Sequence, residues 1–490
     1  MQAQQDTTVG VLGAGLSGVL MGMQLRRAGI DDFTIYEKQP DVGGTWLRNT
    51  YPGLHCDIPS LLYSYSFEPN PSWSMVYAGQ PEIQRYVRAC AEKYDLIDRI
   101  RFGTTVEVAR YDEDRAGWTL ELGDGSTVRH RLLVSATGGL TDERLPRIPG
   151  LERFRGPMWH SSNWRDDLDL STLRVAVVGS AASAVQVVPA VADRAASVVV
   201  FSRTPNWVMP RNNRPYDDDD HRDLATDDGM RRARRRQYRD ALLWWKAFRR
   251  EERGLAELRA TCLANLHGAI TDPAMRAALT PDYDPGCKRI LLSDDYYPAL
   301  AREHVTLVPH GVEALTETGV VAADGSEHEV DVVIFCTGYR LGGRADGRPA
   351  VEVHGRGGGR LVDALAGRPE AYYGLAVPGF PNYFTVCGIN GTVAYGAVFA
   401  SAELATEAIA HYARRLVDGE FRSVEVRPDV TRRWSDQVQS ELQAMSWAGA
   451  CPNFYRDGSG RIVSFFPGTV GRLRRELRGL DDGDFVLEPV

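Results

Sequence analysis

Three glycines near the start of the chain have the spacing of a nucleotide-binding turn. Gly13, Gly15 and Gly18 form G-x-G-x-x-G within "TTVGVLGAGLSGVLMGMQLRRAGIDDFTIYEK", whose pattern predicts strand, turn, helix and strand. Gly13 would permit the tight turn, Gly15 would let the backbone approach a pyrophosphate, and Gly18 would let the helix pack closely on the sheet. Glu37, which closes the second strand, would accept hydrogen bonds from a ribose. The sequence therefore predicts that this unit binds a dinucleotide on the helix N-terminus.

A second unit, "LRVAVVGSAASAVQVVPAVADRAASVVVFSRTP", carries a degraded form of the same pattern, Gly179-x-Ala181-x-x-Ala184. Alanine still permits close helix packing, but it leaves less room for a phosphate than glycine does. Arg203 and Thr204 supply a cation and a hydroxyl after the second strand of this unit, where an adenosine 2'-phosphate would lie. This favours NADP over NAD. The alternative for Arg203 is an exposed surface arginine without a coenzyme contact. The residues predicted to contact this coenzyme are Gly179, Ser180, Ser183, Arg203 and Thr204.

The order of these units predicts two nested domains. Strand-like runs that end at Gly138 and Gly338 mark the points where the chain passes from one nucleotide-binding unit to the other. We therefore expect an α/β fold of two Rossmann-like domains, with the NADP-binding domain inserted in the FAD-binding domain. The predicted FAD-binding domain comprises residues 1–140 and 332–490, and the NADP-binding domain comprises residues 141–331, including a helical insertion at 216–285.

Two helical patterns are distinctive. The insertion opens with an acidic stretch, "YDDDDHRD", which indicates a turn or linker, and continues with an arginine-rich amphipathic pattern. We interpret the arginines as a solvated helix face, and recruitment of an anionic partner is the alternative. A second, apolar pattern predicts a long helix over residues 392–417.

Composition restricts the partners. The chain has 490 residues, a net charge of -8 and no apolar run of membrane-spanning length, which argues against binding to nucleic acid or to anionic membranes. We expect a cytoplasmic protein with a small-molecule partner. The seven cysteines show neither a C-x-x-C pair nor a disulfide framework, so most are expected to be buried apolar residues. No metal site is predicted.

The segment "FRGPMWHSSNW" resembles a family signature. Phe154, Gly156, His160 and Trp164 match F-x-G-x-x-x-H-x-x-x-W, although Arg165 stands where the family has Pro or Asp. Together with the nested units, this match resembles the class B flavoprotein monooxygenases and, among them, the Baeyer-Villiger monooxygenases. The resemblance implies that the segment links the domains and that His160 couples movement of the nicotinamide to the flavin site. Direct acid–base catalysis by His160 is the alternative.

Further matches extend along nearly the whole chain. "GGTW" and "YPGLHCDIPSLLYSYSF" resemble the segment that passes over the flavin, and "GCKRILLSDDYY" resembles a segment with one lysine at the NADP phosphate and one arginine over the flavin. "CPNFYRDGSGR" has Phe454 where the family usually has Trp. The flavin and coenzyme contacts that the resemblance implies are Gly44, Thr45, Trp46, Asp57, Tyr63, Lys288 and Arg289.

The implied activity is an FAD-dependent, NADPH-consuming monooxygenation of a ketone with O2, which gives an ester or lactone through a C4a-peroxyflavin and a Criegee adduct. Arg289 would stabilise the developing negative charge, and Asp57 would orient its guanidinium as a bidentate pair. An interface salt bridge without a catalytic role is the alternative for this pair. The alternative activities are N- or S-oxygenation, a disulfide reductase, for which Cys56 lacks a partner close in sequence, and a regulatory protein without turnover.

Overall fold

The first of two parallel sheets is formed by the N-terminal nucleotide-binding unit. The computed structural model describes residues 6–340, 350–396 and 398–490. The sheet has the order β21–β7–β1–β2–β3, and all its pairs are parallel. Its strands are short apolar runs, as expected where helices or other layers cover both faces. They are β1 (Val9–Leu12), β2 (Phe33–Tyr36), β3 (Ile100–Arg101), β7 (Leu132–Ser135) and β21 (Tyr383–Thr385).

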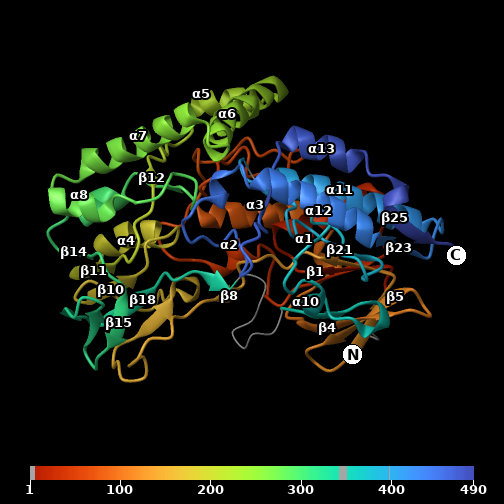
Figure 1. Cartoon of the computed structure of the whole chain (residues 1–490), viewed down its shortest axis with the longest axis horizontal. Helices are drawn as coiled ribbons and strands as arrows, with labels where there is room; N and C mark the ends of the chain where they lie inside the picture. Colours follow the sequence, from red (N-terminus) through yellow and green to blue (C-terminus); the bar gives the residue numbers. More distant parts are fainter. Residues whose placement is uncertain (1–5, 341–349, 397) are drawn as a thin grey trace.

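The second parallel sheet has the order β14–β11–β10–β18–β9 and lies beside the first (Figure 1). Its strands are β9 (Met158–His160), β10 (Arg174–Val178), β11 (Ser197–Phe201), β14 (Val305–Val308) and β18 (Val332–Phe335). All five lie between β7 and β21 in the sequence, so the second unit is inserted in the first. The α/β fold with two dinucleotide-binding units is confirmed by this topology.

The expected boundary between residues 331 and 332 requires a correction. It falls before β18, which pairs with β10 and β9 and so belongs to the second sheet. The apolar run of β18 is buried in the middle of that sheet, so the chain returns to the first unit only after this strand. Residues 341–349 and 397 of the predicted 332–490 part lie outside the described residues.

In each unit one helix follows the central strand of the sheet, and one small antiparallel meander is added. The helices are α1 (Leu16–Arg27) and α4 (Ala184–Ala192). The first meander is β4 (Val106–Asp112), β5 (Gly117–Leu122) and β6 (Thr127–His130), to which β20 (Glu352–His354) is added. The second is β15 (Val312–Leu315), β16 (Gly319–Ala322) and β17 (Glu327–Glu329). The two units are thus built on the same plan.

The helical insertion lies above the second unit in Figure 1, and its α5 and α6 extend toward the middle of the molecule. It comprises α5 (Asp218–Leu224), α6 (Asp227–Phe248), α7 (Glu252–Ala269) and α8 (Pro273–Leu279), within the expected 216–285. The acidic stretch, expected to be a turn or linker, instead begins a helix, because the Asp217 side chain caps α5 and aspartates in a first turn favour the helix dipole. The arginine-rich pattern divides into α6 and α7 at Arg250, whose φ is 57°.

The long C-terminal helix begins later than expected. Residues 392 and 393 form a short strand, β22 (Thr392–Val393), which pairs with β24 (Phe465–Phe466), and the helix is α11 (Val398–Val417). Gly396, with φ 72°, interrupts the helical path between them. The remaining elements are α2 (Thr45–Arg48), α3 (Gln80–Lys93), α9 (Tyr296–Leu300), α10 (Leu361–Ala364), α12 (Pro428–Leu442), α13 (Val470–Arg478), β8 (Asp142–Glu143), β12 (Val208–Met209), β13 (Leu291–Leu292), β19 (Tyr339–Arg340), β23 (Ser423–Val426) and β25 (Phe485–Glu488).

Most of the cysteines are buried, as expected, but two of them form a disulfide that was not predicted from the sequence. Cys287 and Cys451 are joined in a disulfide although they are 164 residues apart in the sequence. That separation leaves no local spacing signal from which the pair could have been predicted. Cys56, Cys90 and Cys262 are free and buried, as expected for small apolar residues.

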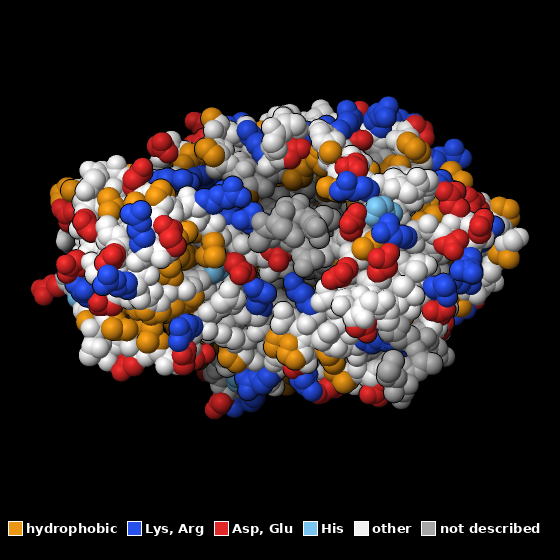
Figure 2. Space-filling view, turned by 90° about the horizontal axis from the view of Figure 1, so that it is seen from below, with side chains coloured by type: hydrophobic (Ala, Val, Ile, Leu, Met, Phe, Trp, Pro, Cys, Tyr) orange, Lys and Arg blue, Asp and Glu red, His pale blue; other side chains and the backbone are white. Residues whose placement is uncertain are grey.

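The visible surface carries charges of both signs. Acidic and basic side chains are interspersed over the face seen in Figure 2, and no broad area of one sign stands out there. Within the described part of the chain, none of the helices combines the length and apolarity needed to cross a membrane. Among the same residues, no cluster of three or more His, Cys, Asp or Glu side chains could hold a metal ion.

Candidate active site

A cavity of about 1860 Å³ lies between the two units and the insertion. Single drug-sized ligands occupy cavities of about 300–1,000 Å³, so this one has room for more than one molecule. Eleven of the residues predicted from the sequence line it: Thr45, Trp46, Asp57, Tyr63, Gly179, Ser180, Ser183, Arg203, Thr204, Lys288 and Arg289. The other predicted residues lie outside its lining: they are the glycines of the first turn, Glu37, Gly44 and the four residues of the signature segment.

The first turn has the close packing that its glycines predict. Gly13 has φ 95°, and a Cβ on Gly18 would lie 1.8 Å from the Gly13 carbonyl oxygen, so Gly18 tolerates no side chain without movement of α1. A Cβ on Gly15 would meet only the Cα of Gly44, at 3.6 Å. Gly15 and Gly44 thus leave an open backbone surface at the start of α1, where a pyrophosphate could approach.

Glu37 binds to the turn itself. Its side chain is buried, Oε2 accepts a hydrogen bond from the Ala14 N–H at 2.7 Å, and Oε1 accepts one from the Gln39 N–H at 2.8 Å. Carboxylate oxygens can accept more than one hydrogen bond, so these contacts leave capacity for a ribose hydroxyl. The ribose contact of Glu37 stays a prediction.

The "GGTW" segment builds one wall of the cavity. Its Thr45 and Trp46 begin the short helix α2, and the Trp46 indole Nε1 donates a hydrogen bond to the Tyr63 hydroxyl at 2.8 Å. The two rings pack edge to face with centroids 5.6 Å apart. Burial raises the pKa of Tyr63 well above its ordinary value, so the phenol stays protonated. This wall is therefore aromatic and uncharged.

The second turn is held by its own polar side chains. Gly179 has φ 129°, and a Cβ there would lie 2.4 Å from the Cys336 carbonyl oxygen. The Ser180 hydroxyl donates to the Thr204 carbonyl at 2.8 Å, and the Asn206 amide donates to the Ser180 carbonyl at 2.9 Å. Asn206 was not predicted from the sequence. These bonds fix the turn against the loop that follows β11.

Two cations stand close to this turn. The Lys288 ammonium lies 4.7 Å from the centroid of the Tyr283 ring, and burial, with the nearby charge of Arg203, lowers the pKa of Lys288. Within the described residues, the Arg203 guanidinium forms no ion pair, and its chain lies beside Gly311. The charge of Asp282 acts on Lys288 in the opposite direction and raises its pKa. The two neighbouring cations make a surface suited to a phosphate.

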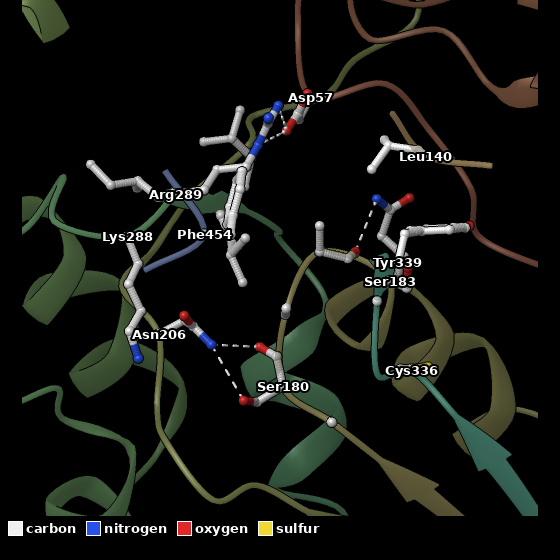
Figure 3. Close-up of a pocket in the computed structure, with 18 of the residues that line it drawn as sticks. Asp57, Leu140, Ser180, Ser183, Asn206, Lys288, Arg289, Cys336, Tyr339 and Phe454 are labelled. Carbon is white, nitrogen blue, oxygen red and sulfur yellow. Dashed lines mark hydrogen bonds and ion pairs between the residues drawn. The ribbon is translucent and has the colours of Figure 1, made fainter. Parts of the chain in front are cut away.

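Arg289 and Asp57 form an ion pair in the cavity wall, on the far side from Lys288 and Ser180 in Figure 3. The Arg289 Nε and Nη2 both donate to Oδ2 of Asp57, at 2.9 and 2.5 Å. The expected bidentate pair is thus corrected, because one carboxylate oxygen accepts both bonds. The carboxylate raises the pKa of Arg289 further above its ordinary value, so the guanidinium is charged at any working pH.

The signature segment lies at the seam between the units and does not line the cavity. A Cβ on Gly156 would lie 2.1 Å from the Asp331 carbonyl oxygen, which explains the glycine, and the Phe154 ring is buried beside it. Trp164 packs edge to face on Trp159, with ring centroids 5.8 Å apart. Phe154, Gly156 and Trp164 therefore pack against residues of the second unit.

His160 is at the end of β9 and is 2% exposed. Its Nδ1 lies 2.8 Å from the Ser162 hydroxyl, and burial lowers the pKa of the imidazole. The ring packs edge to face on Tyr339, with centroids 5.5 Å apart, and Tyr339 lines the cavity. This geometry gives His160 an indirect path to the site and no contact with reacting atoms, which speaks against direct acid–base catalysis.

Several cavity residues were not predicted from the sequence. Gln237, Asp240, Ala241, Trp244 and Phe248 all come from α6 and line the cavity. Their spacing of three or four residues places them on one face of the helix. That spacing was visible in the sequence, but only the fold shows that this face meets the cavity.

The cysteine beside the flavin segment is not part of a redox pair. Cys56 lines the cavity, but it is free, and burial raises the pKa of its thiol above its ordinary value. The disulfide-reductase alternative requires a partner for this thiol, and the described residues offer none.

The chain is similar to known monooxygenases over its whole length. Residues 6–219 match the family model described as flavin-binding monooxygenase-like. A Baeyer-Villiger monooxygenase of Streptomyces coelicolor is 39% identical over an alignment that covers 100% of this chain and 94% of the relative. A second Baeyer-Villiger monooxygenase, from Pseudomonas aeruginosa, is 36% identical over an alignment that covers 99% of this chain and 92% of the relative.

Solved structures show the same relationship. Cyclohexanone monooxygenase from Rhodococcus sp. Phi1, bound to NADP+, superposes with a TM-score of 0.88 at 26% identity and covers 100% of both chains. The complex of OTEMO with FAD and NADP superposes with a TM-score of 0.87 at 26% identity, over 98% of this chain and 99% of that one. The resemblance proposed from the signature segment is confirmed, and the chain belongs to the Baeyer-Villiger monooxygenases, a family of NADPH-dependent flavin monooxygenases that use FAD.

Proposed function

We propose that this chain inserts one oxygen atom from O2 beside the carbonyl of a small-molecule ketone, with Arg289 and Asp57 as its catalytic pair. The observation that carries this proposal is the position of the pair, in a large cavity that is lined by the second dinucleotide-binding turn and by Thr45 and Trp46 of the "GGTW" segment. A permanently charged donor at that place is what an oxygenation through anionic intermediates requires.

The residues fit the two cofactors of the family. FAD would lie over the turn of Gly13, Gly15 and Gly18, where the backbone at Gly15 is open, with Gly44, Thr45, Trp46 and Tyr63 beside its ring system. NADPH would lie over Gly179, Ser180 and Ser183, with its 2'-phosphate at Arg203, Thr204 and Lys288. Bound FAD, once reduced by NADPH, supplies the activation of O2.

Arg289 is suited to stabilise negative charge. Two of its N–H groups donate to Asp57. The Arg289 side chain is 50% exposed in the wall of the cavity, so its remaining donors can reach a bound molecule. A guanidinium held in place by a carboxylate needs little reorganisation when an oxyanion forms on the substrate, so the stabilisation is larger than a mobile cation gives. Asp57 therefore acts by orienting Arg289.

Three aromatic side chains of the wall support the exclusion of water. Trp46, Tyr63 and Trp447 line the same cavity as Arg289 and carry no charge. An apolar enclosure strengthens electrostatic interactions and prevents loss of reactive species to water. The substrate is a ketone small enough to share the cavity with the coenzyme, and we place the reaction in the cytoplasm, where the family's NADPH is supplied.

Substitution of Arg289 tests the proposal. In Arg289→Ala we expect ester or lactone formation from a ketone to fall by about 10²-fold or more, which is the scale of losing one oxyanion donor. FAD content and the rate at which NADPH reduces the flavin should be unchanged. Arg165→Ala is the matched control, because Arg165 also pairs with an aspartate but lies exposed outside the cavity. Ester formation at the wild-type rate in Arg289→Ala would refute the catalytic role.

Heteroatom oxygenation is the second candidate, and product analysis separates it from the first. Attack on a sulfide or amine needs no stabilised oxyanion on the substrate, so it depends less on Arg289. If wild-type protein converts sulfides to sulfoxides but yields no ester from any ketone tested, the activity is S-oxygenation. Mass analysis of both product classes with ¹⁸O₂ makes the distinction.

A further inference from the structure

The disulfide between Cys287 and Cys451 joins two segments that both reach the cavity. Cys287 directly precedes Lys288 and Arg289, and Cys451 directly precedes residues 452–455. Lys288, Arg289 and all four residues 452–455 line the cavity, whereas neither cysteine does. The cross-link therefore lies immediately behind the site, between the segment that carries the catalytic arginine and the loop opposite it.

Other contacts between the two segments are few. We call residues 286–289 the arginine segment and residues 446–456 the C-terminal loop. The Ser446 hydroxyl donates to the Gly286 carbonyl at 3.1 Å, and a Cβ on Gly449 would lie 3.1 Å from the Cys287 sulfur. Phe248 of α6 packs on Trp447, with ring centroids 5.4 Å apart. One hydrogen bond and the packing around Phe248 thus support the covalent bond between the two segments.

The C-terminal loop also faces the arginine itself. Tyr455 is 4% exposed, and its electrostatic interaction with Arg289 and Asp57 shows that it lies near the pair. Phe454, by contrast, is 53% exposed and is drawn beside Arg289 in Figure 3. The Cα atoms of the bridged cysteines are 6.3 Å apart, within the usual range for a disulfide. The bridge thus limits how far the backbone at Cys287, two residues before Arg289, can move from the C-terminal loop.

We propose that Cys287 and Cys451 form a reversible thiol–disulfide site whose oxidised state positions Arg289 for oxygen transfer. This inference rests on the proposed function. Disulfides that persist in reducing compartments are usually of the redox-sensing kind, and the cytoplasm proposed for this enzyme is such a compartment. The cysteines are positioning residues, since neither contacts the cavity.

Each change of state is a thiol–disulfide exchange. In oxidation, a small disulfide RSSR takes the two electrons from the Cys287 and Cys451 thiols, leaves as two RSH molecules, and the bond between the two sulfurs forms. In reduction, a dithiol attacks that bond, returns two electrons and two protons to the cysteines, and becomes a disulfide itself. Both cysteines are buried, at 2% and 7% exposure, so exchange requires a local opening of the C-terminal loop.

The test compares oxidised and reduced FAD-containing enzyme. After treatment with oxidised glutathione, denatured protein should show five reactive thiols of the seven cysteines, and after dithiothreitol it should show all seven. We expect reduction to lower the ester formed per NADPH consumed by about tenfold, less than the ~10² that a misplacement of 1 Å can cost. Hydrogen peroxide should replace the missing ester, because the electrons from NADPH still reach O2.

Variants separate positioning from simple stabilisation. Cys287→Ala and Cys451→Ala should each reproduce the reduced enzyme and no longer respond to either reagent. Cys262→Ala is the matched control, because Cys262 is buried in α7 and does not line the cavity. It should keep the wild-type response.

The outcomes are distinguishable. Seven reactive thiols after oxidation, or equal ester yield per NADPH in both states, would overturn the inference, and so would a lower melting temperature with unchanged yield. If neither the oxidised nor the reduced enzyme makes an ester from any ketone, the proposed function is wrong. The number of reactive thiols then still shows whether the disulfide forms.

Discussion

The two nucleotide-binding turns differ in sequence but share one hydrogen-bond framework. The Gly13 N–H donates to the Tyr36 carbonyl at 2.8 Å, and the Gly179 N–H donates to the Phe201 carbonyl at 3.0 Å. The first helical bonds, from Val19 to Gly15 and from Val185 to Ala181, also correspond, at 3.0 and 3.1 Å. The backbone of the turn is therefore set by the strands and the first glycine, which both units keep.

The third position of the motif shows where the units diverge. A Cβ at Gly18 would lie 1.8 Å from the carbonyl oxygen of Gly13, whereas Ala184 carries its methyl group in the buried core of the second unit. The assigned helix also starts later in the second unit, at Ala184 instead of the position of Leu16. The second helix thus stands slightly away from its turn, and the alanine fills the space.

This difference gives the largest predicted effect. Gly18→Ala should destabilise the fold by about 3 kcal/mol or more, since overpacking a closed contact forces the helix to shift, and FAD should be lost with it. Ala184→Gly is the matched change in the second unit and should cost only about 1 kcal/mol, from helix propensity. Denaturant unfolding and the FAD content of the purified proteins measure both effects. Equal destabilisation by the two changes would contradict the comparison.

The meanders of the two units differ in one buried histidine. His130, on β6, is 4% exposed, its Nε2 lies 2.9 Å from the Tyr36 hydroxyl, and its Nδ1 lies 2.9 Å from the Thr7 carbonyl. Burial lowers its pKa from the ordinary 6.5 to about 4. His328, on β17 of the second meander, is only partly buried. Acid should therefore act on the first unit through His130.

The sign of this effect follows from proton linkage. Between pH 6.5 and about 4 the unfolded chain binds a proton at His130 and the folded chain does not, so stability falls as the pH falls through this window. The loss reaches about 3 kcal/mol at its lower end. His130→Gln should remove this part of the acid dependence, and His328→Gln, the matched control, should leave it unchanged. The measurement is the free energy of unfolding at pH 7 and at pH 4.5. An equal decrease in this free energy for wild type and His130→Gln would refute the prediction.

Local spacing predicted the turns but not the contacts between distant segments. The nested order of the units, the insertion at 216–285 and the family were all readable from glycine spacing and strand patterns. The pairing of Cys287 with Cys451 was not, because sequence separation carries no information about which loops meet. The position of Asn206 was missed for a related reason, since its role depends on how the loop after β11 folds back on Ser180.

Side-chain geometry was also less predictable than side-chain identity. Asp57 and Arg289 are brought together as expected, but a single carboxylate oxygen accepts both bonds. The boundary at residue 331 was displaced because a buried apolar strand gives no sign of which parallel sheet it joins. The geometry of an ion pair and the sheet that a strand joins both depend on tertiary packing and register, which cannot be seen in one sequence.

The ends of the second strands give the last comparison. The registers of both sheets align Tyr36 with Phe201, so Glu37 corresponds to Ser202, and Arg203 corresponds to Lys38. Arg203 thus stands one residue beyond the position where it was expected. The first unit places a buried carboxylate against its turn, and the second has a small hydroxyl there and a cation on the cavity wall. This exchange is what a change from a ribose hydroxyl to a 2'-phosphate requires.

Coenzyme choice tests this exchange. Arg203→Ala should raise the KM for NADPH by about 10- to 100-fold, the scale of one hydrogen bond to a charged group, and should leave the KM for NADH unchanged. Lys38→Ala is the matched control, because Lys38 holds the same register position in the first unit and does not line the cavity. Steady-state kinetics with both coenzymes provide the measurement. Equal catalytic efficiency of the wild type with NADH and NADPH would show that Arg203 does not read the phosphate, and that the second turn differs from the first only in packing.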